Sequence, residues 1–416
     1  MNSTNSKNIV LISSSIPTML SFRRQLTELL LSHGHNVHII WNANKVNHNN
    51  EFDNITTHPR TNLYPIGPRN FFSLENITYT AKLYGLMNKI KPDLAICFES
   101  PSILTGNMVF TLLNWSTKVI NFFPWLWKYK ELLERSYKWI GVLASKMVLW
   151  VHNPVVAMNT SDEVFLRRVI KQPDISVIPA EYMDTIFTPV SDNEIEVKFS
   201  NKYPTFAFIW RVNEEKWATR LLKALELLPA EVLDKINILI WWHICGNNVQ
   251  AWIDILTKKY PNIYYLGVLN SQEVRTALSR KVHCTLLPSR CKEGVPTILR
   301  ESSMSGVLSI TTIVPGCNKF FFDNTYNKLA ISCSTWEPED IKKAILEFWD
   351  LYQNNKQLLI ERVKKTRNHV QETMSNEHVT VFRIELLQKY GIELTPLPAP
   401  WADLWEPLHP QISVVQ

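Results

Sequence analysis

The sequence predicts an α/β protein built from two doubly wound domains that face each other across a cleft. A chain of 416 residues is longer than one hydrophobic core of ordinary size requires, and 45% hydrophobic residues are enough to build two. Short β-rich runs alternate with helical patterns along most of the chain. Continuous apolar strands separated by helices are typical of a parallel sheet that is covered on both faces.

The strand candidates form two series, separated by a polar stretch at 191–202. The first series comprises 8–13, 36–41, 93–98, 118–123 and 146–151. The second comprises 205–210, 236–242, 262–266, 282–287 and 307–312. From Pro338 to Tyr390 the pattern turns helical, and 396–410 reads as an extended tail. Because doubly wound sheets bind ligands at the carboxyl ends of their strands, we expect the site between the two domains.

Charge and cysteine content exclude several classes of protein. The net charge of +6 arises from 44 basic and 38 acidic residues mixed along the chain, which favours anionic partners but no nucleic acid. The six cysteines contain no CxxC pair, so we expect reduced thiols and neither a disulfide framework nor a zinc site. No Asp-x-Asp motif or histidine cluster has metal-ligand spacing, so we expect no metal.

Two observations concern membranes. The polar start, 1–8, lacks the features of a signal peptide, and no apolar run reaches the roughly 18 residues of a spanning helix. We therefore expect a cytoplasmic protein. The stretch 124–139 mixes Trp and Tyr with basic residues on a helical pattern. It fits a helix in a membrane interface or, equally well, a core-facing helix with a basic outer face.

The segment 287–301, LPSRCKEGVPTILRE, carries the most specific signal because it ends a strand, forms a loop and opens a helix. Pro296 suits the first helical turn, and the free N–H groups of that turn favour an anion such as a diphosphate. Glu293 lies in the loop, and Glu301 lies roughly 7 Å further along the helix axis. The alternative is that both are surface carboxylates around a capped helix.

The surrounding motifs resemble family 4 glycosyltransferases of the GT-B fold. Pro-Ser precedes the loop, Glu-Gly-Val-Pro lies within it, and 311–317, TTIVPGC, follows the next strand. The family's motif is Glu, seven residues, Glu. The resemblance is strongest to the branch that makes bacterial surface polysaccharides and lipid-linked oligosaccharides, of N-acetylgalactosaminyltransferase type. At lower specificity it extends to 21–37, 177–189 and 210–217.

This resemblance implies a division of the chain into two Rossmann-like domains and a C-terminal part. Residues 1–190 would bind the acceptor, and residues 200–360 would bind a nucleotide sugar. Residues 361–416 would form helices and a tail that pack back on the N-terminal domain.

The resemblance also implies roles for individual residues. Arg211 and Lys216 would bind the donor diphosphate, Glu293 the transferred sugar and Glu301 the ribose hydroxyls. The implied catalytic residues are Glu293, Arg211 and Lys216, and the implied substrate-binding residues are Glu301, Gly294, Val295 and Pro296. Fixed cations stabilise the charge that builds on a departing diphosphate. Glu99 and His152 are further cleft candidates, whereas His35 and His243 read as structural.

The implied activity is a retaining, metal-independent and cofactor-free transfer of a hexosyl or N-acetylhexosaminyl group. The donor would be a nucleotide sugar, a UDP-sugar, and the acceptor a glycan or a polyprenyl-diphosphate-linked sugar in polysaccharide biosynthesis. The enzyme would lie peripherally on the inner face of the cytoplasmic membrane. Bulky Trp210, Trp217 and Trp242 stand where the family has glycine. The alternatives are therefore a degenerate, non-catalytic homologue that binds lipid-linked glycan or a partner transferase, and another GT-B activity such as an epimerase or a phosphorylase.

Overall fold

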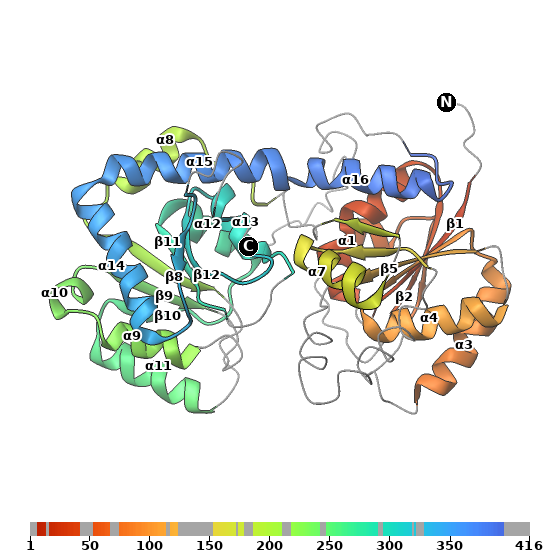
Figure 1. Ribbon diagram of the computed structural model, residues 1–416, viewed down its shortest axis with the longest axis horizontal. Helices are drawn as coiled ribbons and strands as arrows, with labels where there is room; N and C mark the ends of the chain where they lie inside the picture. The colour runs from red at the N-terminus through yellow and green to blue at the C-terminus, as the bar shows by residue number, and fades with distance from the viewer. Residues whose placement is uncertain are drawn as a thin grey trace, which may run out of the picture.

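The computed structural model describes residues 6–13, 16–41, 53–66, 75–113, 117–123, 153–171, 174–178, 186–209, 218–241, 247–289, 294–317, 320–321 and 328–394. Two domains lie side by side, each a sheet flanked by helices (Figure 1). Two long helices, drawn in blue, run along one side of both domains. The predicted doubly wound α/β class is confirmed.

Within these residues the first domain has a seven-stranded parallel sheet with the order β3-β2-β1-β4-β5-β6-β7. Its strands are β1 (Asn8–Ile12), β2 (Asn36–Ile40), β3 (Thr61–Tyr64), β4 (Leu94–Phe98), β5 (Lys118–Phe123), β6 (Val155–Ala157) and β7 (Ile175–Val177). Its helices are α1 (Ile16–Ser32), α2 (Asp53–Thr56), α3 (Glu75–Ile90), α4 (Ser100–Leu113) and α7 (Thr160–Phe165), and α7 continues into the π-helical turn η3 (Leu166–Ile170).

Both faces of this sheet are buried, because successive residues of one strand enter different cores. Ile9 and Leu11 pack on the side of α1, whereas Val10 and Ile12 pack on the side of α3 and α4. Side chains alternate between the two faces of a strand, so a strand that is buried on both sides must be apolar throughout. This explains why β1 and β4 were recognisable from sequence.

The second domain repeats this plan with a six-stranded parallel sheet in the described residues, in the order β10-β9-β8-β11-β12-β13. Its strands are β8 (Thr205–Ile209), β9 (Asn237–Trp241), β10 (Ile263–Tyr265), β11 (Cys284–Leu287), β12 (Leu308–Thr312) and β13 (Ile331–Cys333). Its helices are α8 (Asp192–Phe199), α9 (Ala218–Glu226), α10 (Ala230–Leu233), α11 (Asn247–Lys259), α12 (Ser271–Arg280), α13 (Thr297–Met304) and α14 (Pro338–Asn354).

The polar stretch between the two strand series forms α8. Ser191 caps this helix: its side chain accepts from the Glu194 backbone N–H, and the Glu194 carboxylate accepts from the Ser191 backbone N–H. Ile195 and Phe199 are completely buried in the core of the second domain. Two buried apolar residues four positions apart are enough to anchor this short, largely polar helix. The polar composition of 191–202 therefore did not predict a helix.

The last two helices divide their packing between the domains. Helix α15 (Lys356–Met374) adds Leu359 and Val363 to the second domain's core. Helix α16 (Asn376–Lys389) adds Ile384 and Leu387 to the first domain's core. Ser375, with an extended backbone (φ −62°, ψ 158°), separates them and caps α16. The chain therefore returns to the first domain at its C-terminal end (Figure 1).

The remaining differences from the predicted strands are local. Strands β3, β6, β7 and β13 were not predicted, and each has only three or four residues. The predicted strand at 146–151, the aromatic and basic stretch 124–139 and the tail 396–410 lie outside the described residues. Cys97, Cys284, Cys317 and Cys333 are buried free thiols, as predicted. In the part of the chain that is described, no helix is both long enough and apolar enough to cross a membrane.

Candidate functional site

The site segment begins where the strand order of the second sheet reverses. Strands β8 and β11 are neighbours there, although four helices and two strands of the described chain separate them in sequence. Such a reversal opens a crevice at the carboxyl ends of the strands, where doubly wound proteins bind ligands. β11 ends at Leu287, and the segment 288–296 leads from that end to α13.

Hydroxyl groups from β12 hold the start of this segment. The Thr311 hydroxyl donates to the Leu287 carbonyl at 2.9 Å, and the Thr312 hydroxyl donates to the Ser289 carbonyl. Both threonines and Ser289 are buried. Burying a hydroxyl without a partner is costly, so these bonds fix the chain as it leaves the sheet. The TT pair that contributed to the sequence signal thus anchors the loop.

Helix α13 starts without a side-chain cap. Pro296 is its N-cap residue rather than part of its first turn, and proline has no side-chain hydrogen-bonding group. Val295, Ile298 and Leu299 are at most 5% exposed and pack in the core behind the helix. The helix is therefore held by apolar contacts, and the backbone N–H groups of its first turn have no capping side chain from Pro296. This arrangement suits an anionic ligand.

Glu301 is the fifth residue of α13, and its carboxyl group has a shifted pKa. Glu301 is partly exposed. Burial raises the pKa of Glu301 to about 7, against the opposing effects of the Arg300 charge and of a hydrogen bond from Thr297. A carboxyl group that titrates near neutral pH at a strand-end crevice is typical of a functional site.

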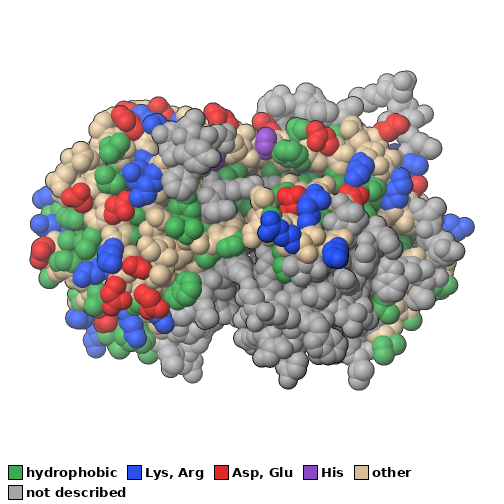
Figure 2. Space-filling model, viewed as in Figure 1, with side chains coloured by type: hydrophobic (Ala, Val, Ile, Leu, Met, Phe, Trp, Pro, Cys, Tyr) green, Lys and Arg blue, Asp and Glu red, His purple; other side chains and the backbone are tan. Residues whose placement is uncertain are grey.

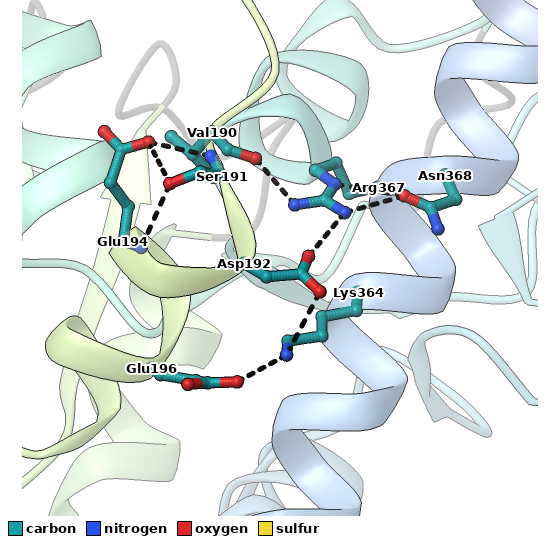
Figure 3. A network of polar contacts seen from close by, with 8 residues as sticks. All are labelled: Val190, Ser191, Asp192, Glu194, Glu196, Lys364, Arg367 and Asn368. Atoms are coloured by element: carbon teal, nitrogen blue, oxygen red, sulfur yellow. Dashed lines mark hydrogen bonds and ion pairs between the residues drawn. The ribbon is translucent and has the colours of Figure 1, made fainter.

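The end of α13 contacts the first of two segments that connect the domains, and Figure 3 shows the polar network that joins this segment to α15. The Val190 N–H donates to the Met304 carbonyl at 2.9 Å. Arg367 of α15 donates to the Val190 carbonyl at 2.6 Å and to Asp192 at 2.8 Å. Lys364 forms ion pairs with Asp192 at 3.2 Å and with Glu196 at 2.6 Å. Arg367 is the buried partner in this network, and it ties the connecting segment to α15 directly behind the site helix.

Gly306 lies where the chain turns from α13 into β12, and no side chain fits at this position. Its φ of +65° lies in the left-handed region. An added Cβ would come within 2.7 Å of Ile195 and 2.8 Å of Val190. The turn from α13 into β12 therefore requires glycine.

A residue of the first domain also contacts the site loop. The Asn159 side chain donates from Nδ2 to the Gly294 carbonyl at 3.1 Å. Asn159 follows β6 and caps α7, and in Figure 1 α7 lies on the side of the first domain that faces the second. Sequence reasoning missed this residue. The Asn-Thr-Ser-Asp run at 159–162 was a readable helix-start signal, but nothing in it indicated a contact 135 positions away.

The structure thus gathers four of the seven predicted site residues, Gly294, Val295, Pro296 and Glu301, in one loop and helix start. The Val295 side chain is 4% exposed and belongs to the core, so a ligand would meet its backbone. Glu293, Arg211 and Lys216 lie outside the described residues. The same holds for Trp210, Trp217, Trp242, His152 and His243. The assigned roles stay predictions.

The cleft candidate Glu99 and the histidine read as structural, His35, are both buried. Glu99 is 7% exposed and follows β4 with φ at +70°, a left-handed conformation that is uncommon for a residue with a side chain. Its charge acts on the buried Arg23 guanidinium, which lies 4.8 Å from the centre of the Phe98 ring. His35 is 1% exposed and accepts from the Lys7 N–H, and burial lowers its pKa. The burial of His35 and its hydrogen bond to Lys7 therefore indicate a structural role.

Comparison with protein families identifies the second domain. Residues 191–366 match the family described as glycosyl transferases group 1. The match begins at Ser191, the cap of α8, and ends within α15, so it includes the whole second sheet. No curated protein matches the chain in sequence.

Solved structures resemble the whole chain. Sucrose-phosphate synthase from Thermosynechococcus elongatus has a TM-score of 0.71 and 16% identity, over 92% of this chain and 98% of that one. A glycosyltransferase from Rickettsia africae has a TM-score of 0.68 and 14% identity, over 93% and 99%. HepE from Anabaena, in complex with UDP and glucose, has a TM-score of 0.67 and 10% identity, over 92% and 99%. Both domains and their arrangement are therefore those of the GT-B fold, and the second domain matches the family model of glycosyl transferases group 1 over residues 191–366.

Proposed function

We propose that this chain is a retaining glycosyltransferase that moves a sugar from a UDP-sugar to a glycan or a polyprenyl-diphosphate-linked sugar. The observation that carries the proposal is the strand end and helix start within 287–301, with a partly exposed Glu301 whose carboxyl pKa is raised, inside the region that matches glycosyl transferases group 1. HepE was solved with UDP-glucose, which supports a uridine nucleotide as donor. WaaG, a glycosyltransferase involved in lipopolysaccharide biosynthesis with a TM-score of 0.62 and 11% identity, supports a role in surface-polysaccharide synthesis.

In the proposed reaction the donor diphosphate lies at the start of α13, and Arg211 and Lys216 neutralise the charge that it gains. Glu301 accepts hydrogen bonds from the ribose hydroxyls, and Glu293 holds the transferred sugar. The bond between the anomeric carbon and the diphosphate breaks. The acceptor hydroxyl bonds to that carbon from the same face, and its proton passes to a phosphate oxygen. Donors fixed around a developing charge lower the barrier because they need no reorganisation during the reaction.

Calorimetry with UDP-, GDP- and ADP-sugars tests the donor, and release of UDP in the presence of a lipid-linked acceptor tests transfer. We expect heat with a UDP-sugar and a product whose anomeric configuration, measured by NMR, equals that of the donor. An inverted product would exclude the retaining mechanism. No heat with any nucleotide sugar would favour the non-catalytic homologue that the tryptophans at 210, 217 and 242 suggest.

Metal independence is part of the proposal. We expect EDTA to leave the transfer rate unchanged within error. A rate that falls with EDTA and returns with Mn²⁺ would contradict it.

We also propose peripheral attachment to the inner face of the cytoplasmic membrane through the aromatic and basic stretch 124–139. High salt or carbonate should release the protein from membranes, because screening weakens the attraction of basic residues to anionic lipid. Extraction by detergent alone would rule out an interfacial attachment.

A further inference from the structure

The contact between Asn159 and Gly294 connects the first domain to the loop that opens the site helix. Its donor is rigidly placed. Asn159 is 2% exposed, and its backbone is extended (φ −153°, ψ 163°) at the start of α7. Its Oδ1 accepts from the Asp162 N–H at 2.9 Å, which identifies the other amide atom as the donor.

The two hydrogens of the Asn159 amide have different partners. Nδ2 donates to Asp162 Oδ2 at 3.0 Å within the first domain and to the Gly294 carbonyl at 3.1 Å in the second. Because the ring formed with Asp162 fixes the plane of the amide, the hydrogen directed at Gly294 has little freedom. A donor held in this way imposes its geometry on the acceptor.

The acceptor, the Gly294 carbonyl, lies just before the start of α13. The Gly294 carbonyl and the Val295 N–H belong to one planar peptide, so a bond that orients the carbonyl also orients the N–H. On the far side of this peptide, the Val295 side chain is packed in the core and Pro296 occupies the N-cap position of α13. The peptide is therefore fixed from the second domain at one end and from the first domain through Asn159.

We propose that Asn159 is a positioning residue: it orients the Gly294–Val295 peptide for the donor diphosphate, and it does so only while the two domains are close together. This inference rests on the proposed function for its ligand. Donor binding and closure of the domains then favour each other, since any coupling between two equilibria is reciprocal. Loss of one such hydrogen bond should weaken donor binding about three- to tenfold.

The substitution Asn159→Ser separates this role from helix capping. Serine caps helices about as well as asparagine, but it has no amide to reach Gly294. Asn270→Ser is the matched control, because Asn270 caps α12 through the same kind of bond, to the Glu273 N–H at 2.9 Å, and is exposed in the second domain.

We expect both variants to keep a melting temperature close to that of the wild type. Asn159→Ser should raise the dissociation constant and the KM for the nucleotide sugar about three- to tenfold. Asn270→Ser should change neither. Unchanged donor affinity and KM in a folded Asn159→Ser variant would overturn the proposal.

A second measurement needs no ligand and no activity. Hydrogen–deuterium exchange of peptides covering 288–299 should be faster in Asn159→Ser than in the wild type and in Asn270→Ser. If exchange rises although no nucleotide sugar binds to any of the proteins, the positioning role holds and the proposed function fails. If exchange in this segment is identical in all three proteins, the positioning role is wrong whatever the ligand.

Discussion

Strands β4 and β11 occupy equivalent places in the two domains, yet the carboxylates that follow them have opposite environments. Each strand lies next to the first strand of its sheet, on the side where the order reverses. Glu99 directly follows β4, and Glu301 lies in the helix after β11. Glu99 is buried and Glu301 is partly exposed, yet the carboxyl pKa that burial raises is that of Glu301.

The difference lies in the neighbouring charge. Glu99 faces the guanidinium of Arg23, which stays a cation because burial lowers its pKa only to about 10. At Glu301, burial outweighs the charge of Arg300, and the carboxyl pKa rises to about 7. The strand end of the first domain is thus neutralised by the protein's own side chain. The strand end of the second domain retains a carboxyl group whose charged form a ligand with hydroxyl donors would stabilise.

The largest expected effect is on Glu99. Replacing it in Glu99→Gln leaves the buried Arg23 charge without its carboxylate, and breaking a buried pair costs about 3–5 kcal/mol of unfolding free energy. Urea unfolding measures this loss, and Glu301→Gln is the matched control. Equal unfolding free energies of the two variants would contradict this prediction. They would mean that the buried charge of Arg23 is not stabilised by Glu99.

Glu301 should affect stability in the opposite direction and in a pH-dependent way. Its folded-state pKa of about 7 lies above its ordinary value of 4.5, so the folded protein binds this proton more tightly than the unfolded chain does. The charged form therefore destabilises the fold above pH 7, by at most roughly 3 kcal/mol, and this cost disappears as the pH falls towards 4.5. Glu301→Gln should be more stable than the wild type at pH 8.

Urea unfolding at pH 8 and at pH 4.5 measures this difference. The advantage of Glu301→Gln should shrink to nearly zero at the lower pH. A variant that is less stable than the wild type at pH 8 would show that the carboxylate is well solvated or paired.

Transfer activity should depend on Glu301 and not on exposed carboxylates. Glu301→Ala should lower the transfer rate about tenfold or more, equivalent to about 1.4 kcal/mol, and Glu293→Gln should do the same. Glu361→Ala, which removes an exposed carboxylate of α15, should leave the rate unchanged. Steady-state kinetics on proteins with unchanged melting temperatures decides this, and full activity in both site variants would refute the assignment.

The smallest effect concerns Thr297, whose hydroxyl bonds to Glu301 and lowers its pKa. Thr297→Val keeps the shape of the side chain and removes that bond, so the pKa of Glu301 should rise further. If binding requires the carboxylate, donor affinity increases with pH through this pKa, and the whole profile should move to higher pH in the variant. Calorimetry between pH 6 and 9 measures the shift. A shift to lower pH would contradict the assigned direction of the bond.

In the described residues the strands of five or more residues were predictable, whereas four of the six shorter ones, β3, β6, β7 and β13, were not. A strand buried on both faces, such as β1 or β4, must be apolar at every position, and that pattern is visible in any sequence. Strand β3 (Thr-Asn-Leu-Tyr) is partly exposed at the edge of the sheet, and β13 has three residues. Such strands are specified mainly by the neighbour to which they bond. Helix α8 was missed for the related reason that, of its apolar residues, Ile195 and Phe199 alone are buried in the core.

The chain around the site was readable because its chemistry is local. The strand end at Leu287 and the helix that carries Glu301 lie within fifteen consecutive residues, and strand and helix both form where the sequence pattern predicts them. The raised pKa of Glu301 could not be predicted from the sequence. It depends on how completely other segments enclose its carboxyl group.

By itself the sequence determined the two-domain α/β architecture and the loop and helix of the candidate site, because periodic burial and short-range motifs are properties of neighbouring residues. Tertiary structure alone decided two things: the contact of Asn159 with Gly294, and the support of α13 by Val190 and Arg367. Each joins residues that are more than a hundred positions apart. The geometry of such contacts follows from the packing of whole domains, which no local pattern encodes.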